Sequence, residues 1–212
     1  SVPGLVFGTV QTAQHEPRYE ISYCAEVPGM VKSDQGIAIA VKHGLELMDK
    51  SDVIVIPAWS NPSVVASTAL VEALKLANVQ GKLIVGLCLG AFVLGDAGLL
   101  DEREATTHWL ARETFAQRFP KARFRPEVLY ASTDNIMTSA GTLAAIDCCL
   151  HLVMQRYGAE TANRTAKLLV TPPHRQGGQS QYVEHSVPRL ATETHLSDVL
   201  IWARQNLASD LS

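Results

Sequence analysis

The sequence predicts an α/β fold in which helices cover a mainly parallel sheet. Two short apolar runs rich in β-branched residues, residues 52–57 (DVIVIP) and 82–87 (KLIVGL), have the composition of buried parallel strands. Each run is followed by a loop or a tight turn, and then by a stretch whose apolar residues recur with helical spacing. A length of 212 residues suits one such domain with a small appendage.

The composition is that of a globular protein with a substantial core, because 47% of the residues are hydrophobic and 18% are charged. A formal net charge of −3 argues against binding of nucleic acid phosphates by this chain. The sequence has neither an uninterrupted apolar run of about 18 residues nor a charged-then-apolar leader. We therefore expect no membrane segment and no secretion.

The four cysteines are Cys24, Cys88, Cys148 and Cys149. Their spacing matches neither a disulfide framework nor a zinc site. We therefore expect a cytoplasmic protein with no metal and no cofactor, since reduced thiols are typical of that compartment.

The first part of the chain gives weak signals. Residues 1–8 are apolar and suit either an edge strand or the end of a helix, and residues 11–18, which contain a proline, suit a loop. Residues 19–25 (YEISYCA) alternate between apolar and polar side chains and predict a strand. Residues 30–32 and 37–41 predict a short hairpin.

The middle of the chain carries the two strand runs and the elements between them. A short helix is expected at 44–50, before the first run. A loop at 58–62 follows that run, and residues 63–79 are predicted to be helical. After the second run, an apolar helical stretch continues to Gly98.

The second half alternates strands with helices. In chain order, we expect a turn at 99–104, a brief strand and loop at 105–109, a helix at 109–119, strands at 123–131 and 135–138, and helices at 142–157 and 159–170 separated by Gly158.

The helix at 142–157 should be deeply packed, because apolar side chains recur along one face. That face comprises Leu143, Ile146, Leu150, Val153 and Tyr157, widened by Cys148 and Cys149. Residues 171–184 should form an exposed Pro/Gly-rich stretch, and Ser197 is expected to cap a last helix ending at residue 207.

Gly86-Leu87-Cys88-Leu89-Gly90 has the pattern of a nucleophile elbow, with Cys in place of Ser. Such a turn places the cysteine in strained backbone angles, and the glycines allow close backbone approach. The N–H groups at the start of the following helix favour a thiolate. The alternative is a buried, inert cysteine.

Ligands bind at the C-terminal ends of strands in open α/β sheets, so Ala58, Trp59 and Cys88 should surround one crevice. Of seven histidines, His108 is best placed to act as a base for Cys88, because its loop should return to these strand ends. The alternative is a loop histidine bonded to the backbone. Trp59 and Trp109 are either pocket walls or ordinary core or surface aromatics.

Asp147 lies in an otherwise apolar helix, where a carboxylate needs a partner. We expect a structural ion pair with an arginine rather than a catalytic role.

Residues 85–109 (VGLCLGAFVLGDAGLLDEREATTHW) resemble the PfpI-like branch of the class I glutamine amidotransferase superfamily. They resemble more closely the amidotransferase-like N-terminal domain of AraC-family transcriptional regulators. Three further segments agree with this resemblance, which extends to about residue 184: 55–59 (VIPAW), 138–142 (TSAGT) with Ile146-Asp147, and 172–179 (PPHRQGGQ).

The resemblance implies a flavodoxin-like three-layer sandwich that is usually dimeric. Residues 1–184 would be a sensor and dimerisation domain, and residues 185–212 a linker and the first helix of a truncated helix-turn-helix domain. DNA would then be bound only through a domain missing from this chain. An unidentified small-molecule effector would bind at the catalytic-like pair Cys88 and His108, and the site would also contain Ala58, Trp59, Leu89 and Trp109.

Three departures from the enzymes of this superfamily argue against catalysis. Leu89 stands where histidine often follows the cysteine, and Ala58-Trp59 stand where the enzymes have a pair of glycines. This change weakens one half of an oxyanion hole, although the Leu89 N–H could still donate. The family's first strand and the acidic residue after it have no counterpart here.

Two alternatives to a regulator remain. One is a cysteine-dependent hydrolase, hydratase or amidase that uses Cys88 as nucleophile and His108 as base. The other is a purely structural dimerisation module.

Overall fold

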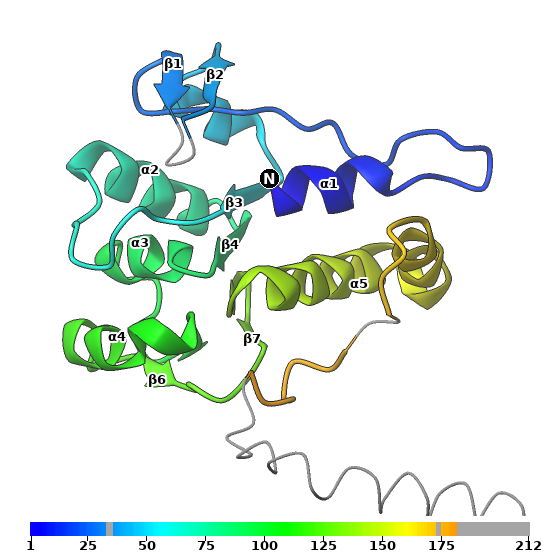
Figure 1. Ribbon diagram of the computed structural model, residues 1–212. Helices are drawn as coiled ribbons and strands as arrows, with labels where there is room; N and C mark the ends of the chain where they lie inside the picture. The colour runs from blue at the N-terminus through cyan, green and yellow to red at the C-terminus, as the bar shows by residue number, and fades with distance from the viewer. Residues whose placement is uncertain (33–35, 173–174, 182–212) are drawn as a thin grey trace, which may run out of the picture. The chain divides into compact units, whose positions relative to one another are not determined.

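A four-stranded sheet in the order β3-β4-β8-β7 carries the fold of the described residues, which are 1–32, 36–172 and 175–181 of this computed structural model (Figure 1). The strands are β3 (Val53–Ile56), β4 (Leu83–Leu87), β7 (Tyr130–Thr133) and β8 (Ile136–Ser139). β3, β4 and β8 are parallel, whereas β7 and β8 form an antiparallel hairpin. The two apolar runs are therefore adjacent parallel strands, as predicted.

Helices cover both faces of this sheet, as the sandwich prediction requires (Figure 1). α1 (Val2–Thr9) and α5 (Thr142–Leu168) lie on one face, and α2 (Thr68–Val79) and α3 (Gly90–Asp96) on the other. Side chains of β4 alternate between the two cores. Val85 and Leu87 pack with α1 and α5, whereas Ile84 packs with α2 and α3.

The start of the chain contains a helix and a hairpin. Residues 1–8, left open between a strand and a helix, are helical from Val2 onward as part of α1, which Ser1 precedes. The predicted hairpin is confirmed as β1 (Gly29–Lys32) antiparallel to β2 (Ala38–Val41), and the short helix before β3 is the 3-10 helix η1 (Leu45–Lys50).

The predicted strand at 19–25 is wrong. Only Cys24 pairs with another strand-like residue, through an isolated bridge to His43. Among the described residues, the segment 19–25 forms no extended strand pairing. Tyr19 packs instead between the rings of Phe7 and Tyr157, at centroid distances of 4.9 and 5.5 Å. Alternation predicts a strand only where a neighbouring strand can pair with it.

The helix predicted at 63–79 begins later, at Thr68, because Ser67 caps it by accepting a hydrogen bond from the Leu70 N–H. The strand predicted at 123–131 is two strands. β6 (Arg123–Phe124) pairs with β5 (Glu104–Ala105), and the chain continues through Pro126, which cannot donate to a ladder, before β7 begins.

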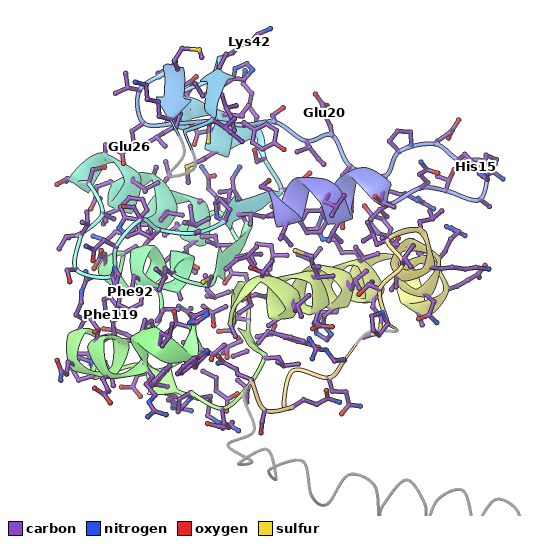
Figure 2. All side chains as sticks on the ribbon, in the orientation of Figure 1. His15, Glu20, Glu26, Lys42, Phe92 and Phe119 are labelled. Carbon is purple, nitrogen blue, oxygen red and sulfur yellow. The ribbon has the colours of Figure 1, made fainter. Side chains whose placement is uncertain are left out.

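The helix predicted at 109–119 consists of the 3-10 turn η2 (Trp109–Ala111) and α4 (Arg112–Arg118). It packs on α3 through aromatic rings. Phe92 and Phe119, labelled in Figure 2, meet edge to face at a centroid distance of 5.7 Å. This contact holds α3, which begins directly after the turn at Cys88, against the segment that contains α4.

The predicted break at Gly158 is confirmed, since α5 has a φ of 83° there. The predicted packed face is wrong at Leu143, which is 69% exposed, whereas Ala144 and Cys148 are buried. The buried stripe begins one residue later than the spacing suggested. No helix among the described residues is both long and apolar enough to cross a bilayer.

Asp147 is buried and paired with an arginine, as predicted. The Arg175 guanidinium donates to Asp147 Oδ2 from Nη2 at 2.6 Å and from Nε at 3.1 Å. This ion pair fastens the segment after α5 to the helix. The predicted last helix, and the boundary at 184/185, lie outside the described residues.

Removal of Arg175 should leave the Asp147 carboxylate buried without its cation. We expect Arg175→Ala to lower the free energy of unfolding by about 2 kcal/mol, less than for a fully buried pair because Arg175 is 39% exposed. Urea unfolding measures this change. Arg123→Ala is the control, because Arg123 and Glu102 are 67% and 76% exposed and lie 3.7 Å apart. Equal effects of the two substitutions would contradict the assigned role of Arg175.

Candidate functional site

The elbow predicted at Cys88 is present in the structure. β4 ends at Leu87, α3 begins at Gly90, and Cys88 between them has a φ of 54°. A non-glycine residue in this left-handed region is strained and needs support from its surroundings. Part of this support is a hydrogen bond from the Cys88 N–H to the Ser139 carbonyl at 2.9 Å.

The two glycines of the elbow, Gly86 and Gly90, lie too close to neighbouring backbone to carry a side chain. A Cβ on Gly90 would lie 2.3 Å from the Ile56 carbonyl oxygen at the end of β3. A Cβ on Gly86 would lie 3.0 Å from the Ala91 nitrogen in the first turn of α3. α3 therefore starts in direct contact with the ends of two neighbouring strands.

The Cys88 thiol is half-buried, and burial raises its pKa above that of a free thiol. The Leu89 N–H bonds to the sulfur and lowers the pKa, but this effect is smaller than that of burial. Among the described residues, no charged side chain measurably raises or lowers the pKa of Cys88. The expected preference for thiolate is therefore wrong, because desolvation outweighs the N–H groups of the turn.

His108 is bonded to the backbone, which was the alternative to a role as base. Its Nδ1 accepts a hydrogen bond from the Leu110 N–H at 3.2 Å and caps η2. Its ring lies against Gly141, where an added Cβ would be 3.0 Å from Cδ2. Within the described part of the chain, no hydrogen bond joins His108 to the Cys88 thiol.

Thr107 connects the His108 loop to the elbow. Its hydroxyl donates to the Cys88 carbonyl at 2.8 Å, and its side chain is buried. Both Cys88 and His108 are thus held near the C-terminal end of β8, Cys88 through Ser139 and His108 through Gly141.

The other predicted site residues follow these same strand ends. Ala58 is exposed in the loop after β3. Trp59 is half-buried against the α2–α3 core, as Leu89 is, and donates from Nε1 to the Val64 carbonyl at 2.9 Å. Trp109 is 42% exposed and stacks on His108 at a centroid distance of 6.0 Å. Both tryptophans are therefore partly available to a ligand.

A buried ion pair that the sequence analysis missed holds the Trp59 loop. Asp96 accepts from the Ala66 N–H at 2.8 Å and pairs with Arg118, which also bonds to the Pro62 carbonyl. The signal was a carboxylate in an apolar helix, Asp96 at the end of α3, comparable to Asp147 inside α5. Over residues 1–32, 36–172 and 175–181, no three His, Cys, Asp or Glu side chains lie close enough to hold a metal ion.

Comparison with known proteins gives a family match over most of this domain. The sequence profile of the DJ-1/PfpI family matches residues 7–155. The transcriptional regulator CdhR of Pseudomonas aeruginosa is 32% identical over 142 residues, which are 67% of this chain and 42% of CdhR. The regulator GlxA of Rhizobium meliloti is 28% identical over 151 residues, which are 71% of this chain and 46% of GlxA. The chain thus spans less than half of these two regulators.

Similarity also extends to an enzyme and to solved structures. The isonitrile hydratase of Pseudomonas putida is 28% identical over 134 residues, 62% of this chain and 57% of the enzyme. An AraC family regulator from Pseudomonas putida has a TM-score of 0.69 at 23% identity, covering 79% of this chain and 90% of that one. Oxidised DJ-1 of Toxoplasma gondii has a TM-score of 0.62 at 25% identity, with the same coverages. These likenesses show the flavodoxin-like fold.

A side chain at position 90 should separate α3 from β3. We expect Gly90→Ala to lower the free energy of unfolding by about 2 kcal/mol through overpacking. Gly178→Ala is the control, because a Cβ there would meet nothing within 4 Å. Chemical denaturation of both variants measures the difference. A Gly90→Ala protein within about 0.5 kcal/mol of the parent would contradict the assigned contact.

The raised pKa of Cys88 should make its thiol slow to react. In a Cys24→Ser protein, which lacks the exposed thiol, we expect iodoacetamide to alkylate Cys88 more slowly at pH 7 than it alkylates N-acetylcysteine. Because the thiolate forms only at alkaline pH, the rate should still rise at about pH 9. Mass spectrometry of Cys88 over a pH series measures this. A rate plateau below about pH 8 would contradict it.

Proposed function

The chain belongs to the DJ-1/PfpI family, and on that premise we propose that it is the ligand-sensing and dimerisation domain of an AraC-type transcriptional regulator. Its aligned relatives CdhR, ArgR and GlxA are named HTH-type transcriptional regulators, and the matched regions are 42%, 35% and 46% of their lengths. DNA binding would then reside in a further domain, which agrees with the net charge of −3 of this chain.

The observation that carries this proposal is an elbow that keeps its geometry while its sulfur lacks a base. Burial raises the pKa of Cys88, and the Nδ1 of His108 is bonded to the Leu110 N–H. A nucleophilic cysteine needs a lowered pKa or an adjacent base, and neither is present among the described residues. This arrangement supports reversible binding rather than covalent catalysis.

The proposed effector site lies at the C-terminal ends of β3, β4 and β8. Cys88 and His108 form its centre, and Ala58, Trp59, Leu89 and Trp109 surround them. The Nε2 of His108 is the ring nitrogen that the backbone leaves available for a ligand. Binding of a small, unidentified effector would favour one of two arrangements of a cytoplasmic homodimer and so reposition its DNA-binding domains.

A second candidate is a cysteine-dependent hydratase or related enzyme. It is supported by the similarity to isonitrile hydratase and by the strained backbone of Cys88, with a φ of 54°. In that case Cys88 would be the nucleophile, and His108 would have to approach it when substrate binds.

The open reading frame that contains this chain tests the regulator proposal. We expect it to continue beyond residue 212 into a helix-turn-helix pattern, and we expect the longer protein to shift operator DNA in a gel. Deletion of that continuation should abolish the shift, whereas Cys88→Ser should preserve it. A reading frame without such a pattern would overturn the proposal.

The effector site is tested by affinity. For an effector found by thermal-shift screening, we expect His108→Ala to weaken binding about tenfold in calorimetry, because one hydrogen bond is lost. Leu110→Ala is the control, since Leu110 is adjacent and 72% exposed. Undiminished binding by His108→Ala would remove His108 from the site.

A further inference from the structure

The last described residues are fastened to the domain by a series of hydrogen bonds. We call residues 175–181 the exit segment, because the chain leaves the described domain after Gln181. Arg175 pairs with Asp147 at its start. The Leu129 N–H then donates to the Gly177 carbonyl at 2.7 Å, and the Gln181 N–H donates to the Glu127 carbonyl at 2.8 Å. The segment therefore lies along residues 127–129 as an irregular extra strand.

The segment ends at a side-chain amide with an unusual set of partners. Gln181 Nε2 lies 2.9–3.0 Å from four oxygens: Thr106 Oγ1 and the carbonyls of Thr107, Pro126 and Val128. An amide nitrogen has two hydrogens, so these acceptors share them. The position of the amide therefore depends on the positions of residues 106, 107, 126 and 128.

The other end of the same amide is unsatisfied. Gln181 Oε1 is buried and has no hydrogen-bond partner among the described residues. A buried acceptor without a donor costs free energy that would be recovered in water. The attached state of Gln181 is therefore only partly favourable, and a small displacement of its acceptors would shift the balance toward release.

Thr107 links this amide to the effector site. Its carbonyl accepts from Gln181 Nε2 at 3.0 Å, while its hydroxyl donates to the Cys88 carbonyl at 2.8 Å. The next residue is His108. Thr106 is fixed on both sides as well, since its N–H donates to Thr138 Oγ1 in β8 at 2.9 Å. Any ligand that moves residues 106–108 must therefore move acceptors of Gln181.

We propose that the Gln181 amide couples occupancy of the Cys88–His108 site to the chain that follows it. A ligand that displaces the 106–108 loop breaks the contacts of Gln181 and releases the exit segment from residues 127–129. This inference rests on the proposed function, because it assumes that the elbow is the sensing site. It adds the residue through which that site acts on the rest of the protein.

A covalent probe of the elbow replaces the unidentified effector in the test. In a Cys24→Ser protein, iodoacetamide at alkaline pH adds a carboxamidomethyl group to Cys88, while Cys148 and Cys149 are 0% and 1% exposed. We expect the label to raise amide exchange at Leu129 and Gln181 at least about fivefold. The Ile84 amide, bonded to Asn135 in the sheet, should not change. Hydrogen exchange read by mass spectrometry or NMR measures both.

Two variants identify the residue responsible. Gln181→Ala should exchange rapidly at Leu129 without any label, and the label should add nothing. Gln179→Ala is the matched control, because Gln179 is exposed and donates only its backbone N–H, to Gln176. It should behave as the parent does. Should Gln181→Ala fail to fold, Gln181→Asn keeps the amide but shortens its reach, and it should show the same rapid exchange.

The inference is overturned if labelling leaves the exchange of Leu129 and Gln181 unchanged, or if Gln181→Ala still shows the full response to the label. These outcomes are separate from those for the regulator proposal. A protein whose amides respond, but whose longer form binds no operator DNA, keeps this coupling and loses the proposed function. A DNA-binding regulator whose amides ignore the label loses only the coupling.

Discussion

The contact between the first turn of α3 and the end of β3 is the constraint on which this domain depends. Because Gly90 has no side chain, α3 can start against the Ile56 carbonyl, and the chain must then reverse within two residues. That reversal holds Cys88 at a φ of 54° and directs its carbonyl toward Thr107. The position of the sulfur follows from this approach of backbone to backbone, and Thr107 ties the 106–108 loop to it through the Cys88 carbonyl.

Local patterns predicted the parts of the fold that depend on local physics. The runs at 52–57 and 82–87 became β3 and β4 because buried parallel strands need apolar side chains on both faces. Gly158 interrupts α5 with a φ of 83°, as expected because glycine adopts positive φ angles more readily than other residues. The prediction at 19–25 failed because a strand requires a partner that the sequence does not reveal. Leu143 failed because it lies in the first turn of α5, where spacing does not show how far the core extends, whereas Leu150 and Val153 on the same predicted face are buried.

In the site, too, local sequence predicted some features, whereas others depend on contacts between distant residues. Cys88 and the strand ends around it followed from the elbow pattern, but the state of its thiol did not, since burial depends on neighbours distant in sequence. Thr107 and Gln181 could not be predicted, because their roles arise from hydrogen bonds between residues 19 and 74 positions apart. The Pro/Gly-rich stretch at 171–184 was predicted only to be exposed, and its resemblance to the family gave no contact. In the structure, Arg175 and Gly177 are partly buried and attach their part of the chain to α5 and β7.

We propose that this elbow, which keeps its shape while burial raises the pKa of its cysteine, holds a ligand rather than transforming it. The most direct test is to incubate the purified protein with excess effector and to analyse the small molecule by mass spectrometry. We expect the effector to be recovered unchanged, with one molecule bound per chain. Product in excess of the protein, formed by the parent and not by Cys88→Ala, would show catalysis and contradict it.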